Sequence, residues 1–119
     1  MQKKLLLIAK SAPWSSLNAR ELLDIALSGG AFELPISLLF MGDGVLQPLA
    51  QQQPTVLEQK NLSANLQALP LFEIDAVYVS ADCLAKRGQL ETEKVIAATV
   101  VDTQQITQLL ASHDQVIVL

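Results

Sequence analysis

The chain has 119 residues, of which 50% are hydrophobic and 17% are charged, and its formal net charge is −4. This length fits one domain, and we expect residues 1–119 to form it. An acidic chain without a basic stripe cannot neutralise phosphate backbones, so direct nucleic-acid binding is not expected. No apolar run approaches the roughly 18 residues of a membrane span, and the single cysteine allows no internal disulfide. Both features favour a cytoplasmic protein without a membrane anchor.

The hydrophobic fraction is high for a chain this small. A small domain has a large surface to cover, so part of its apolar content must lie outside the core. Exposed apolar patches larger than a few hundred Å² usually mark a subunit interface. The composition therefore predicts an obligate oligomer.

Strand and helix signals alternate along the first half of the chain. The continuous apolar run Leu5–Ala9 is typical of a strand buried on both faces. Helical spacing follows over 17–28, where two glycines end the helix. A second strand is expected over Ile36–Met41. The glutamine-rich stretch 47–54 is interpreted as a short helical turn followed by a loop.

The alternation continues through the middle of the chain. Leucines at helical spacing predict a helix over 62–69, and Pro70 ends it. A third strand is expected over Ile74–Ser80. A short helix over 81–87 follows it and is closed by Gly88.

The last part of the chain predicts one more helix between two strands. The strands are Val95–Val101 and Val116–Leu119, and the helix spans 103–111 with Asp102 or Thr103 as its N-cap. The helix is expected to turn three apolar residues inward: Ile106, Leu109 and Leu110. This order of elements predicts an α/β fold with three layers, in which a mainly parallel five-stranded sheet carries helices on both faces.

Candidate site residues follow from the rule that ligands bind beyond the carboxyl ends of parallel strands. The polar and reactive side chains expected at that edge are Ser11, Ser15, Ser16, Asp43, Ser80, Asp82, Cys83 and Asp102. Of these, Asp102 is interpreted as a helix cap. Trp14 lies in the same first loop, either tucked over the sheet edge or as an interface anchor. The predicted strand-end cleft consists of Ser11, Trp14, Asp43, Ser80 and Asp82.

Cys83 is the one candidate for covalent chemistry. The start of a helix and the following Lys86 and Arg87 favour a thiolate, whereas Asp82 opposes one. A lone cysteine is nevertheless more often a small core residue than a nucleophile. The sequence leaves both interpretations open.

The remaining signals argue against a complete catalytic or cofactor site. His113 is the only histidine, and it precedes the last strand, at the edge of the sheet opposite the predicted cleft. It cannot complete a triad there, and we expect it to cap a helix or face solvent. The chain has no metal-ligand spacing and no phosphate-binding glycine loop, so neither a metal nor a cofactor is expected.

A series of short motifs carries a family resemblance over the whole chain. In order they are Ser11-Ala12-Pro13, Arg20-Glu21, Leu23-Asp24, Asp43-Gly44-Val45 with Gln47, Leu71-Phe72-Glu73-Ile74-Asp75, Arg87-Gly88 and His113-Asp114. Their order and spacing are similar to those of the DsrE/DsrF-like sulfur-relay family, and within it of the TusC (DsrF) branch.

The resemblance implies membership of a heterohexamer with TusB-like and TusD-like subunits. That complex passes persulfide sulfur from a TusA-like to a TusE-like carrier, towards 2-thiolation of the tRNA wobble uridine. In the TusD-like subunit a cysteine at the end of the third strand carries the sulfur, whereas this chain has Ser80 there, with Cys83 three residues later. The resemblance thus implies a non-catalytic subunit. Three alternatives stay open: a sulfurtransferase using Cys83, a DsrF-like subunit in dissimilatory sulfur metabolism, and a homo-oligomeric binding module.

Overall fold

The protein is built around a parallel β-sheet. The computed structural model describes residues 4–10, 24–29, 35–48, 66–72, 74, 76–92, 94 and 96–118. Within these residues, five parallel strands form one sheet in the order β4-β3-β2-β1-β5. The strands are β1 (Leu5–Ala9), β2 (Ile36–Phe40), β3 (Ala76–Ser80), β4 (Thr99–Val101) and β5 (Gln115–Val118). The predicted α/β class and the parallel sheet are confirmed.

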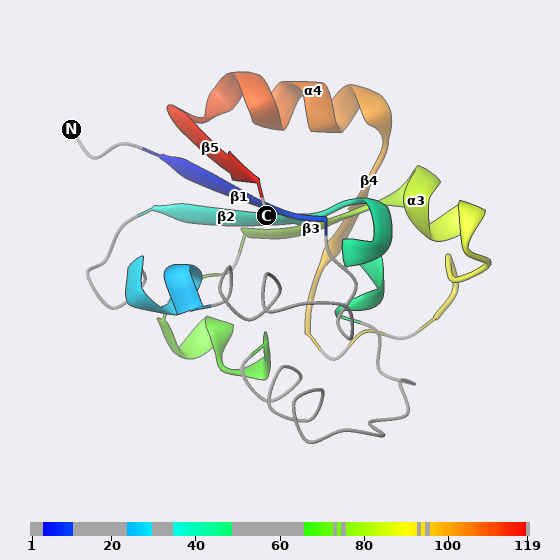
Figure 1. Ribbon diagram of the computed structural model, residues 1–119, viewed down its shortest axis with the longest axis horizontal. Coiled ribbons are helices and arrows are strands. Elements are labelled where there is room, and N and C mark those ends of the chain that lie inside the picture. The colour runs from blue at the N-terminus through cyan, green and yellow to red at the C-terminus, as the bar shows by residue number, and fades with distance from the viewer. Residues whose placement is uncertain are drawn as a thin grey trace.

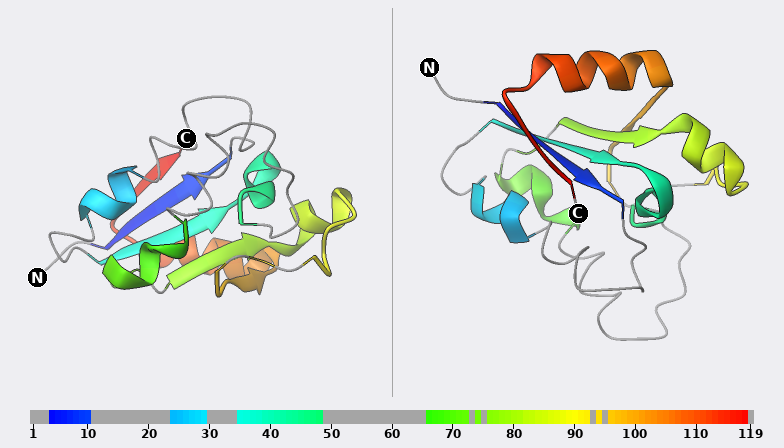
Figure 2. Two further views of the ribbon diagram at one scale, coloured as in Figure 1. Left: turned by 90° about the horizontal axis from the view of Figure 1, so that it is seen from below. Right: turned by 45° about the horizontal axis from the view of Figure 1, so that its top comes forward.

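Helical segments lie on both faces of the sheet, as predicted (Figure 1). The helix α4 (Thr103–Ser112) covers one face, whereas residues 24–29 and the 3-10 helix η2 (Leu69–Phe72) lie on the other. Two further segments, η1 (Gly42–Leu46) and α3 (Ala81–Lys86), follow β2 and β3 at the carboxyl edge (Figure 2).

The strand order explains this division into layers. The chain steps from β1 through β4 in one direction across the sheet, and α4 then returns it to the opposite edge, where β5 pairs with β1. Right-handed crossovers that step in opposite directions must lie on opposite faces of the sheet. α4 therefore covers the face that the earlier connections leave free.

Both faces of β1 are buried, and this is why its sequence is continuously apolar. Leu6 and Ile8 pack with Ile106 of α4 on one face. Leu7 and Ala9 belong to the larger core cluster on the other face.

Two predictions about the last part of the chain are wrong. The fourth strand is shorter than 95–101, because β4 pairs only with the end of β3, while Ile96 and Ala98 pack against the larger core cluster outside the sheet. Leu110 does not face inward but is 43% exposed. The stripe of α4 that contacts the sheet is narrow and holds Ile106 and Leu109.

The ends of the helices show how local sequence sets the boundaries. Asp102, rather than Thr103, is the N-cap of α4. Its Oδ1 accepts from the backbone N–H of Gln105 at 2.8 Å, and its own N–H donates to Gln105 Oε1 at 2.9 Å. This reciprocal capping box satisfies two otherwise unpaired N–H groups. Gly88 follows α3 with φ +65°, a conformation that favours glycine.

Several predicted elements fall partly outside the described residues. Of the helix expected over 17–28, the structure describes 24–29, which is helical. Of 47–54 it describes Gln47 and Pro48, which form a turn after η1, and of 62–69 it describes 66–69. No helix within the described ranges is long and apolar enough to cross a bilayer.

Candidate functional site

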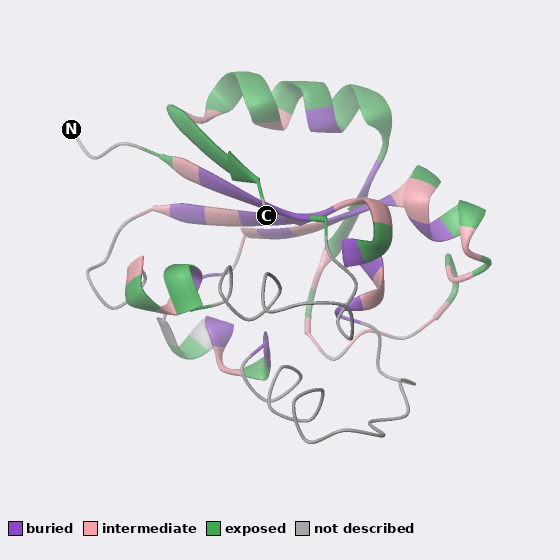
Figure 3. Cartoon of the chain, in the orientation of Figure 1, coloured by how far each residue is buried: buried purple, intermediate pink, exposed green. Residues whose placement is uncertain are grey.

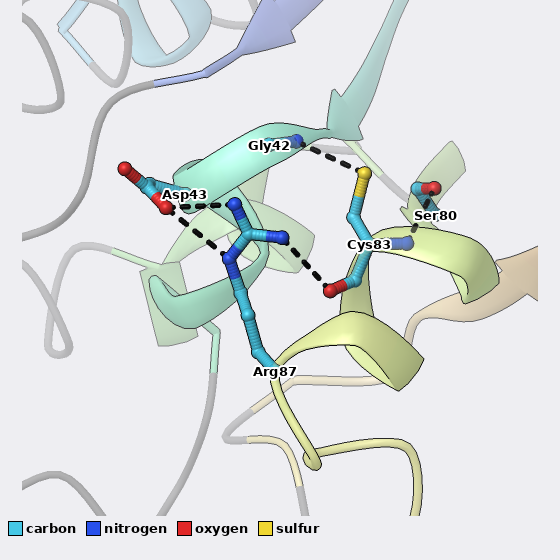
Figure 4. A network of polar contacts seen from close by, with 5 residues as sticks. All are labelled: Gly42, Asp43, Ser80, Cys83 and Arg87. Carbon is cyan, nitrogen blue, oxygen red and sulfur yellow. Dashed lines mark hydrogen bonds and ion pairs between the residues drawn. The ribbon is translucent and has the colours of Figure 1, made fainter.

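The carboxyl ends of β2 and β3 hold a group of connected polar residues (Figure 4). β2 runs into η1 and β3 runs into α3, so parallel pairing of the two strands places η1 and α3 next to each other. The group, called here the strand-end cluster, consists of Gly42, Asp43, Ser80, Cys83 and Arg87.

Ser80 ends β3 and is the N-cap of α3. Its Oγ accepts from the backbone N–H of Cys83 at 3.3 Å, which satisfies one of the unpaired donors in the first turn of the helix. The residue is 3% exposed. The hydroxyl of Ser80 is therefore buried, and it caps the N-terminus of α3.

Cys83 lies in the first turn of α3, as predicted, and is partly buried. Its Sγ accepts from the backbone N–H of Gly42 at 3.3 Å, and its carbonyl accepts from Arg87 Nη1 at 3.0 Å. Gly42 has φ +54°, in the left-handed region that favours glycine. The thiol thus bridges α3 to the start of η1.

Arg87 joins the same two segments through an ion pair. Its Nη2 and Nε donate to Asp43 Oδ1 at 2.7 and 3.2 Å. Both nitrogens converge on one carboxylate oxygen, and the Asp43 side chain is 61% exposed. A pair this exposed contributes at most about 1 kcal/mol. The Arg87 guanidinium is therefore paired with Asp43 and the Cys83 carbonyl.

The structure separates Asp82 and Asp102 from the strand-end cluster. Asp82 Oδ2 accepts from Thr103 Oγ1 at 2.9 Å and so contacts the start of α4. Asp102 caps that helix, as predicted. Of the predicted cleft, the structure therefore brings Asp43 and Ser80 into one cluster, whereas Asp82 makes its bond elsewhere. Ser11, Trp14, Ser15 and Ser16 lie outside the described residues.

Arg87 is the cluster member that the cleft prediction omitted. The sequence placed it beside Cys83 only as a neighbouring charge. A signal was present, since Arg87 lies four residues after Cys83, at the C-terminal end of a short helix, where a guanidinium can reach a carbonyl. Its partner Asp43 is 44 residues earlier in the chain, and no local pattern connects the two.

A close contact of the backbone holds η1 against the end of β1. A Cβ atom built on Gly44 would lie 1.9 Å from the carbonyl oxygen of Ala9. The backbone N–H of Met41 also donates to this oxygen, at 3.0 Å. Gly44 therefore allows η1 to pack where a larger residue could not, and this packing positions Gly42 and Asp43.

His113 lies at the opposite edge of the sheet, as predicted. It is the C-cap residue of α4, with Nδ1 2.7 Å from the carbonyl oxygen of Leu109 and Nε2 2.8 Å from Ser37 Oγ near the start of β2. It is therefore far along the strands from Cys83 and Ser80.

The strand-end cluster has the geometry of a closed network. Asp43 pairs with Arg87, Arg87 with the Cys83 carbonyl, and the thiol with Gly42. Among the described residues, the contact made by the thiol is with a backbone N–H, and no general base lies beside it. No group of three or more His, Cys, Asp and Glu side chains in that part of the chain could hold a metal ion. These contacts can fix the position of α3 against η1.

Comparisons with known proteins agree with the fold. The chain is 50% identical over 119 residues, covering 100% of both sequences, to "Protein TusC homolog" of Pseudomonas aeruginosa. It is 29% identical to "Intracellular sulfur oxidation protein DsrF" of Allochromatium vinosum, covering 96% of this chain and 94% of that protein. The crystal structure of the YchN protein of E. coli shares the fold with a TM-score of 0.86 and 24% identity, over 100% of both chains.

A family model covers almost the whole chain. The model that describes the DsrE/DsrF-like family matches residues 3–119. Together with the full-length similarity to a TusC homolog, this match shows that the chain belongs to the DsrE/DsrF-like family.

Proposed function

We propose that this chain is the TusC-type subunit of a cytoplasmic sulfur-relay complex and that it does not itself carry the sulfur. The similarity to "Protein TusC homolog" over the full length of both chains supports the subunit assignment. The similarity to a DsrF protein supports the same type of subunit.

The single observation that supports the non-catalytic role is the state of Ser80. In the sulfur-bearing sister subunit of this family, a cysteine at the end of the third strand carries the persulfide. Here the position belongs to a serine that is 3% exposed and bonded to the Cys83 N–H. A hydroxyl is a weak nucleophile without an adjacent base, and this one accepts a capping hydrogen bond. In this proposal, Ser80 at the end of β3 caps α3 and does not take part in sulfur transfer.

The proposed partners are a TusB-like and a TusD-like subunit in a heterohexamer. Sulfur would enter from a TusA-like carrier, leave to a TusE-like carrier and serve 2-thiolation of the tRNA wobble uridine. The net charge of −4 suits a subunit that does not contact the tRNA itself. A role in dissimilatory sulfur metabolism is the alternative that the DsrF similarity supports.

Co-purification tests the assignment directly. When the tagged chain is co-expressed with TusB-like and TusD-like proteins of the same genome, we expect all three in one complex at equal stoichiometry. Light scattering coupled to size-exclusion chromatography gives the mass, and a structurally related but unlinked DsrE-like protein is the control. A chain that ignores both partners would contradict the proposal.

A sulfurtransferase that uses Cys83 is the second candidate, because the Gly42 N–H donates to Sγ and would stabilise a thiolate or a persulfide there. We expect that exposure to a cysteine desulfurase and cysteine labels the TusD-like partner and leaves Cys83 without an adduct, as read by intact-mass spectrometry. Sulfur transfer should then persist in the complex with Cys83→Ser. Ser80→Ala, which removes the cap but retains the thiol, is the matched control. An adduct of +32 Da, lost in Cys83→Ser and retained in Ser80→Ala, would favour the sulfurtransferase.

A further inference from the structure

We draw no further inference here: the strongest candidate, the exposed apolar surface along β5 and the outer side of α4 (Figure 3), carries none, because nothing in the structure shows what covers it.

Discussion

Replacing Gly44 with alanine should destabilise the protein by about 3 kcal/mol or more. The added Cβ would lie 1.9 Å from the carbonyl oxygen of Ala9, which belongs to the backbone of the buried strand β1. Neither group can move independently, so η1 must shift away from the sheet and carry Gly42 and Asp43 with it. Urea unfolding followed by circular dichroism measures the loss as a lower midpoint.

Gly88→Ala is the matched control for this prediction. Gly88 has φ +65° but no atom within 4 Å of the added Cβ, so alanine costs only the strain of the left-handed conformation, about 1–2 kcal/mol. The difference between the two variants isolates the steric contact at Gly44. Equal losses of stability would show that η1 does not pack against Ala9 as described.

Phe40→Ala should cost about 3–5 kcal/mol, because it empties the space of a large buried ring. Phe40 is 1% exposed and ends β2, immediately before the segment that supplies Gly42 and Asp43. Its ring belongs to the larger core cluster together with Leu84 of α3. The cavity should therefore weaken the packing of α3 as well as that of the sheet. Chemical denaturation measures the total loss, and hydrogen exchange in residues 81–86 measures the local effect.

Two further variants show whether the loss comes from burial. Phe40→Leu retains much of the side-chain volume and should cost clearly less than Phe40→Ala. Leu71→Ala truncates a side chain that is 84% exposed and should change stability by no more than about 0.5 kcal/mol. If Phe40→Ala and Leu71→Ala were equally mild, the core described on this face of the sheet would be wrong.

The strand-end cluster gives each of its reactive side chains a structural contact. Ser80 and Cys83 lie within one turn of each other, yet the hydroxyl caps the helix and the thiol contacts a backbone amide. The Arg87 guanidinium, which contacts the Cys83 carbonyl, is paired with Asp43. Each reactive group thus serves the packing of η1 against α3.

Local sequence was sufficient for the elements and for several of their ends. The apolar run Leu5–Ala9, the helical spacing around Ile106 and the polar cap Asp102 each act over a few residues, so their patterns predict them directly. For the same reason Ser80 and Cys83 were placed correctly at the end of a strand and the start of a helix. The expected length of the fourth strand was wrong, because the extent of an edge strand depends on its partner.

Only the tertiary structure decided which residues meet across the sheet. The pairing of β2 with β3 brings Asp43 to Arg87, and the pairing of β3 with β4 brings Asp82 to Thr103. The return of α4 to the far edge leaves β5 and the uncharged side of α4 exposed, with Leu110 turned outward. The sequence determined that apolar surface must remain outside the core, because a small chain with this composition has too little interior. The strand order determined that this surface lies along β5, because the edge of a sheet is set by contacts between distant segments.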